Sequence, residues 1–117
     1  MNTNIEQEIQ DKGLTAPRIT PADIEANISS EHYFTATEEI VGMERGPEWQ
    51  AAQQELDFLT FCVLVLRNGF TVTGESACAS PENFDAEIGK KIARTKALEK
   101  IWPLMGYELR SKLSQSV

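Results

Sequence analysis

The sequence has few of the residue types from which small catalytic and metal-binding sites are built. Its 117 residues include two cysteines and one histidine, His32. A structural zinc site needs about four cysteine or histidine ligands grouped together, and this chain does not supply them. His32 stands next to Tyr33 and Phe34, so we expect it to be a structural or surface residue. The sequence therefore predicts neither a metal nor another cofactor.

Long hydrophobic runs are also missing. None approaches the roughly 20 residues that a membrane-spanning helix needs. The residues after Met1 are polar and acidic, unlike an export signal, which has a basic segment followed by an apolar one. We therefore expect a cytoplasmic protein without a membrane partner. In that compartment Cys62 and Cys78 should stay reduced, although a disulfide across the hairpin between them remains open.

Basic residues are scarce relative to acidic ones. The chain has 11 Lys and Arg against 18 Asp and Glu, a net charge of -7, which argues against non-specific binding of nucleic acid. Residues 1–60 contain twelve acidic and three basic residues, and residues 61–117 contain six and eight. Either the acidic side chains of the first half simply form a solvated surface, or basic residues of the last helix face an anionic ligand or an acidic partner.

The length favours a single domain over residues 1–117, organised around residues 56–105. An apolar run, 58–66, is separated from a second β-prone run, 70–79, by Arg67-Asn68-Gly69. Asn-Gly between two such runs predicts a hairpin, because both residues tolerate the positive φ of a tight turn. The first run is apolar on both faces, so a second subunit covers one face or the whole strand is buried within one domain. One of these faces would carry Leu59, Phe61, Val63 and Val65.

A long helix is predicted after the hairpin. Ser80 and Pro81 are typical of a helix start, and Pro103 should break or kink the helix. An apolar stripe at helical spacing predicts which residues face the core: Phe84, Ile88, Ile92, Ala97 or Leu98, Ile101, Trp102 and Met105. Gly89 within this stripe suggests a tight helix crossing or close packing on the sheet.

The first half contains weaker signals. We expect a short helix at 2–12 within a mobile arm, 1–19, and a second helix that Thr20 caps and that ends near residues 29–30. The aromatic stretch 31–36 favours a strand, and 37–54 reads as a variable loop with a helical turn or two at 48–55. The predicted fold is α+β: short N-terminal helices, a three-stranded antiparallel meander with a central hairpin, and a long C-terminal helix on one face.

Polar side chains gather where the second strand of the hairpin meets the long helix. Lys90 and Arg94 are one helical turn apart and together could hold a phosphate, although such pairs are more often a solvated surface. The candidate ligand-binding residues are Thr71, Thr73, Glu75, Ser76, Lys90 and Arg94. In the segment 74–78, Cys78 replaces the last glycine of the Gly-x-Ser-x-Gly nucleophile elbow. A hydrolase using Ser76 or Cys78 is thus the least favoured hypothesis, and we expect no enzymatic activity.

Several stretches together resemble a family of tailed-phage and prophage proteins labelled "gp-forty-nine-like", after a coliphage gene product. They are 9–18 (IQDKGLTAPR), 24–28 (IEANI), 66–78 (LRNGFTVTGESAC), 81–89 (PENFDAEIG) and 101–107 (IWPLMGY). The similarity covers most of the chain except 38–55. It implies a phage or prophage product that acts in the bacterial cytoplasm, and it brings no known catalytic residues.

Two functions stay open at this point. We favour a non-enzymatic accessory protein that binds and modulates a host protein, with antiviral-defence proteins among the candidates. The alternative is a homo-oligomeric module that binds and sequesters a nucleotide or another phosphorylated small ligand. Direct binding of nucleic acid ranks below both.

Overall fold

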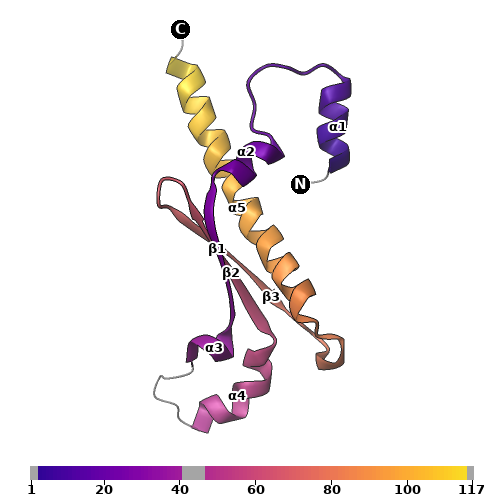
Figure 1. Cartoon of the computed structure of the whole chain (residues 1–117), viewed down its shortest axis with the longest axis vertical. Coiled ribbons are helices and arrows are strands. Elements are labelled where there is room, and N and C mark those ends of the chain that lie inside the picture. Colours follow the sequence, from indigo (N-terminus) through magenta and orange to yellow (C-terminus); the bar gives the residue numbers. More distant parts are fainter. Residues whose placement is uncertain (1–2, 41–46, 116–117) are drawn as a thin grey trace.

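The computed structural model describes residues 3–40 and 47–115. Three strands form one antiparallel sheet in the order β1 (Ile28–Thr35), β2 (Leu59–Leu66) and β3 (Thr71–Ala77). The helix α5 (Ala86–Gln115) packs across one face of this sheet and extends beyond it (Figure 1). The α+β prediction, with its meander and long C-terminal helix, is confirmed. The molecule is elongated, with extents of 61 × 29 × 18 Å.

The N-terminal helices are α1 (Thr3–Asp11) and α2 (Pro21–Ala26). Thr20 caps α2 as predicted: its Oγ1 accepts from the Asp23 amide at 3.1 Å, and the Asp23 carboxylate accepts from the Thr20 amide at 2.9 Å. The predicted end of this helix is too late, since β1 already begins at Ile28. Backbone pairing of Ile28 with Leu66 extends the strand beyond the aromatic residues that indicated it.

Two helices occupy most of the segment that was predicted as a loop at 37–54, and the second of them confirms the helical turn or two that was predicted at 48–55. They are α3 (Ala36–Ile40) and α4 (Pro47–Asp57), and residues 41–46 lie outside the described part of the chain. Thr35 and Glu38 form a reciprocal cap at the start of α3, with N–H···O distances of 3.3 and 3.2 Å. A Thr-x-x-Glu capping box is a sequence signal for a helix start, so the loop prediction was wrong at a position where the sequence carried this signal.

The hairpin between β2 and β3 is confirmed, but its turn differs from the expected one. The Leu66 amide donates to the Phe70 carbonyl at 2.8 Å, and the Gly69 amide donates to the Leu66 carbonyl at 2.9 Å. The loop therefore has three residues, 67–69. Gly69 has φ +88°, whereas Asn68 keeps a negative φ. A three-residue loop needs only one residue in the left-handed region, so the glycine alone meets the requirement.

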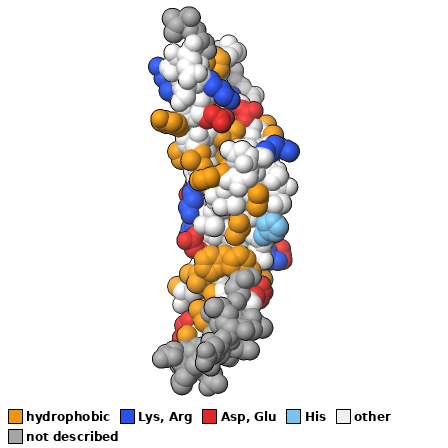
Figure 2. All heavy atoms as spheres, turned by 90° about the vertical axis from the view of Figure 1, so that its left-hand side faces the viewer, with side chains coloured by type: hydrophobic (Ala, Val, Ile, Leu, Met, Phe, Trp, Pro, Cys, Tyr) orange, Lys and Arg blue, Asp and Glu red, His pale blue; other side chains and the backbone are white. Residues whose placement is uncertain are grey.

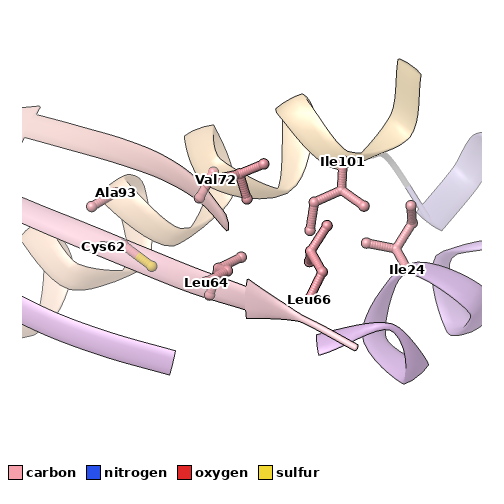
Figure 3. Packing of buried hydrophobic residues seen from close by; sticks show 8 residues of the cluster. Ile24, Cys62, Leu64, Leu66, Val72, Ala93 and Ile101 are labelled. Atoms are coloured by element: carbon pink, nitrogen blue, oxygen red, sulfur yellow. The ribbon is translucent and has the colours of Figure 1, made fainter. Parts of the chain in front are cut away.

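The core lies between the sheet and α5 (Figure 3). Along α5 the buried positions are Gly89, Ala93, Ala97 and Ile101, spaced four apart. The predicted stripe was wrong at Ile88 and Ile92, which are 55% and 43% exposed. A Cβ at Gly74 of β3 would collide with the Ala93 carbonyl oxygen, which means that helix and strand backbones nearly touch. Only small side chains fit such a contact, so large apolar residues do not mark this buried face. The remaining core side chains are Ile24, Cys62, Leu64, Leu66 and Val72.

The start and middle of α5 also differ from expectation. Ser80 makes no side-chain cap and precedes a single 3-10 turn, Pro81–Asn83. Asp85 caps α5 instead, with its Oδ1 accepting from the Ile88 amide at 3.0 Å. Pro103 does not break the helix, which continues to Gln115.

Candidate functional site

The sheet face away from α5, here called the open face, carries an apolar stripe. Its centre is the row of half-buried β2 side chains at 59, 61, 63 and 65, and Phe34 of β1 stacks on Phe61 with ring centroids 5.3 Å apart. Among the described helices, α5 lies on the other face, and α3 and α4 lie at one end of the sheet (Figure 1). Figure 2 shows hydrophobic side chains grouped near the histidine of the chain, which belongs to the open face.

The structure distributes the predicted ligand-binding residues over two sides of the sheet. Thr71, Thr73 and Glu75 are exposed, and their pairing with β2 places them on the open face. Ser76 points the other way, beneath α5, and is 7% exposed. Lys90 lies on α5 and pairs weakly with Glu87, at 3.8 Å. A ligand site that combines these residues stays a prediction.

Arg94, the sixth of these residues, ties three elements together. Its Nη1 and Nη2 donate to the Glu25 carboxylate of α2 at 3.0 and 2.6 Å, and its Nε donates to Glu31 of β1 at 2.6 Å. These bonds raise the pKa of Arg94, those to Glu25 contributing most. The Arg94 guanidinium in turn holds the pKa of Glu31 below its ordinary value. Local spacing indicated a phosphate contact, but here the guanidinium fastens α5 to α2 and β1.

Replacing Arg94 with glutamine should lower the free energy of unfolding by about 1 kcal/mol at pH 7, because two half-exposed ion pairs are lost. The pKa of Glu31 is lowered in the folded state. The stabilisation that the Glu31 carboxylate provides is therefore fully present above the pKa that Glu31 has in the unfolded chain. This contribution is lost as the pH falls through the folded pKa. The difference from the unsubstituted chain should therefore shrink between pH 5 and pH 3.

Urea unfolding at a series of pH values measures this difference. Arg110→Gln, which removes the same charge from an exposed position of α5, is the control and should leave stability nearly unchanged. A loss for Arg94→Gln that is equally large at every pH would refute the role assigned to the ion pairs.

The residues considered for hydrolysis are not assembled into a nucleophile site. Ser76 lies beneath α5, whereas His32 lies on the open face with its Nε2 3.0 Å from the Ser30 hydroxyl. Cys78 is a free cysteine whose Sγ donates to the Ser80 carbonyl at 3.0 Å. Cys62 is free and fully buried, and burial raises the pKa of its thiol. Among the described residues, no group of three or more potential ligands could hold a metal ion.

A cleft of about 870 Å³ lies on the helix side of the molecule, and the sequence did not predict it. It is bounded by α2, the loop after β2 and the outer half of α5. Its apolar lining includes two strongly exposed side chains, Phe70 at 56% and Leu104 at 42%. The other lining residues are Arg18, Ile19, Asp23, Ala26, Asn27, Leu66, Arg67, Asn68, Met105, Glu108 and Leu109.

The polar side chains of the cleft differ in how many of their hydrogen-bonding atoms already have a partner within the chain. Arg18 donates through both terminal nitrogens to Glu6 at 2.8 and 2.6 Å, and these bonds, together with one from Gln10, lower the pKa of Glu6 to about 2. Arg67 donates through Nε to the Ala26 carbonyl, while its two terminal nitrogens have no partner among the described residues. The Asn68 side-chain oxygen accepts from the Phe70 amide at 2.9 Å, which leaves its NH₂ group as a donor. The cleft thus combines exposed apolar groups with unused hydrogen-bond donors.

Comparison with known proteins supports the resemblance seen in the sequence. Residues 19–113 match the family described as phage protein (N4 Gp49/phage Sf6 gene 66). The chain belongs to this family. No curated protein and no solved structure matches it. Membership in this phage family supports a phage-encoded protein, and no helix among the described residues is long and apolar enough to cross a membrane.

Proposed function

We propose that this member of the phage family is a non-enzymatic accessory protein that binds a host protein in the cleft and modulates its activity. The observation that carries the proposal is the exposure of Phe70 and Leu104 beside the unused donors of Arg67. Aromatic side chains and arginine are enriched where protein interfaces gain most of their binding energy. Antiviral-defence proteins of the host are the first class in which to look for the target.

The chemistry of the cleft restricts the target. An exposed segment with one or two large apolar side chains would cover Phe70 and Leu104. A carboxylate or main-chain carbonyl of that segment would accept hydrogen bonds from Arg67. Because the whole chain carries a net charge of -7, a basic surface around the docked segment would speed association.

Affinity capture from bacterial lysate tests this proposal with matched variants. Phe70→Ser combined with Leu104→Ser removes the apolar anchors of the cleft. Tyr107→Ser combined with Ile88→Ser removes two side chains that are 79% and 55% exposed and do not line the cleft. One host protein should be captured by the unsubstituted chain and by the control, and its recovery should fall at least tenfold with the cleft variant. Equal recovery with all three proteins would contradict the proposal.

The same cleft supports a second candidate, a nucleotide or another phosphorylated small ligand. Its volume of about 870 Å³ falls within the range of roughly 300–1,000 Å³ for small-molecule sites. The Phe70 ring could stack on a base, and the terminal nitrogens of Arg67 could bind a phosphate. A ligand that binds the native state must raise the melting temperature. Thermal unfolding with nucleotides and cyclic dinucleotides should then show a shift that Arg67→Gln abolishes, and no shift with any of them would exclude this candidate.

A further inference from the structure

We infer that the free edge of β3 binds an extended segment of another protein, which adds to the sheet as a fourth strand. Among the described residues β3 pairs with β2 alone, so one side of its backbone has no neighbouring strand. The N–H and C=O groups on such an edge can pair with another chain, and several peptide-binding domains use a sheet edge in this way. The segment is therefore recognised first by its extended backbone.

The hairpin turn shows which backbone groups face this edge. The Leu66 amide donates to the Phe70 carbonyl at 2.8 Å, so these two residues form a hydrogen-bonded pair. In an antiparallel ladder such pairs alternate with pairs whose N–H and C=O groups point away from each other. The register therefore directs the backbone groups of Thr71, Thr73 and Glu75 toward the free edge, where they have no partner among the described residues. These three predicted ligand-binding residues would thus bind through their main chain.

The other edge of the sheet, along β1, is less suited to pairing. Its register shifts between Ile28 and Ser30, and bulges are one way in which edge strands avoid pairing. At the other end of β1 the Thr35 amide already donates to Glu38 at 3.2 Å. In contrast, β3 pairs with β2 without a shift. It contains neither proline nor lysine, which often guard an exposed edge.

Two exposed isoleucines of α5 overhang the β3 edge. Ala93 lies over Gly74 of β3, and Arg94 turns toward β1. Successive helical residues are about 100° apart, so Ile92 projects to the opposite side of Ala93, beyond β3. Ile88 stands one turn before Ile92, and the two side chains are 55% and 43% exposed. A fourth strand would place its helix-facing side chains beneath them, which predicts apolar residues at alternate positions of the segment.

Two lysines of α5 add a charge preference. Lys100 reaches across the edge, with its Nζ 3.4 Å from the Thr73 Oγ1, and Lys96 has no partner among the described residues. Both line a groove of about 650 Å³ beside β3. A carboxylate of the segment would bind these ammonium groups more strongly than a hydroxyl does. Because Glu75 and Glu99 line the same groove, a single acidic residue is favoured over an acidic run.

A second copy of this chain fits the edge less well than a different protein. Two copies paired through β3 would have their two-fold axis near Gly74, the middle residue of the strand. Lys96 stands level with Gly74, since its carbonyl carbon would lie 3.1 Å from an added Cβ. The pairing would therefore bring the two Lys96 side chains close together, and like charges across an interface are unfavourable.

Selection from a random library of peptides of about 12 residues, displayed on ribosomes, tests the inference. The unsubstituted chain should select peptides with alternating apolar residues. Thr73→Pro removes an outward amide without removing a bond to β2, and it should weaken peptide binding at least tenfold. Thr73→Ala keeps the amide and is the control, with binding unchanged. No selected peptide, or equal binding by the two variants, would overturn the inference.

Hydrogen exchange, followed residue by residue on the unsubstituted chain, does not depend on how any variant folds. A bound peptide should slow exchange of the Thr71, Thr73 and Glu75 amides and leave the amides of β1 unchanged. Slower exchange on β1 alone would contradict the inference. So would slow exchange on β3 in the free chain that is lost on dilution, because a second copy would then cover the edge.

The same peptides separate this inference from the proposed function. The cleft variant, Phe70→Ser with Leu104→Ser, should bind them as tightly as the unsubstituted chain does. Thr73→Pro should still capture the host protein that binds in the cleft. Peptides that require Phe70 and Leu104 but not the Thr73 amide would overturn this inference and leave the proposed function standing.

Discussion

Replacing Gly74 with alanine is expected to destabilise the fold by about 3 kcal/mol. The added Cβ would collide with the Ala93 carbonyl oxygen and stand 2.5 Å from the Ala97 amide nitrogen. Both are backbone atoms of α5, so no side-chain rotation can relieve the overlap. The helix must move away from β3, and this movement loosens the core layer between them.

Urea unfolding at a fixed protein concentration measures the effect of Gly74→Ala. Gly106→Ala is the matched control, because a Cβ at Gly106 in α5 meets nothing within 4 Å. Alanine favours a helix over glycine by up to about 1 kcal/mol, so the control should be neutral or slightly stabilising. A loss below about 0.5 kcal/mol for Gly74→Ala would show that α5 does not approach β3 as closely as described.

Truncation of Ile101 to alanine is expected to cost about 3 kcal/mol, because this side chain is fully buried between α5 and the sheet. Ile92→Ala should change stability by no more than about 0.5 kcal/mol, since Ile92 is 43% exposed on the same helix. The same urea titration compares the two variants. If Ile92→Ala were the more costly substitution, α5 would pack against the sheet through the side that carries Ile92, and the burial of Ile101 described above would be contradicted.

The periodicity of α5 was misread at Ile88 and Ile92 because it was judged mainly by large side chains. Burial in this helix follows Gly89, Ala93 and Ala97, and the small size of Ala93 and Ala97 matters only once Gly74 is known to lie opposite them. That pairing joins residues about 20 positions apart, and no helical spacing reveals it. The hairpin and the cap at Thr20 depend on neighbouring residues, and these the sequence did predict.

The candidate site was harder to predict for the same reason. The cleft is assembled from three separate segments, 18–27, 66–70 and 104–109, none of which carries a local binding motif. Arg94 was predicted to bind a ligand with Lys90 because the two are one turn apart. Its partners, Glu25 and Glu31, are 69 and 63 residues away in the chain, and only the tertiary fold brings them to it.

The most direct test of host-protein binding in the cleft is photocrosslinking in the bacterial host. A photoreactive phenylalanine analogue is placed at position 70, inside the cleft, or at position 107, where Tyr107 is 79% exposed and lies outside the cleft lining. The account predicts one dominant adduct with a host protein from position 70 and none with that protein from position 107. Equal adducts from both positions, or adducts from position 107 alone, would contradict it.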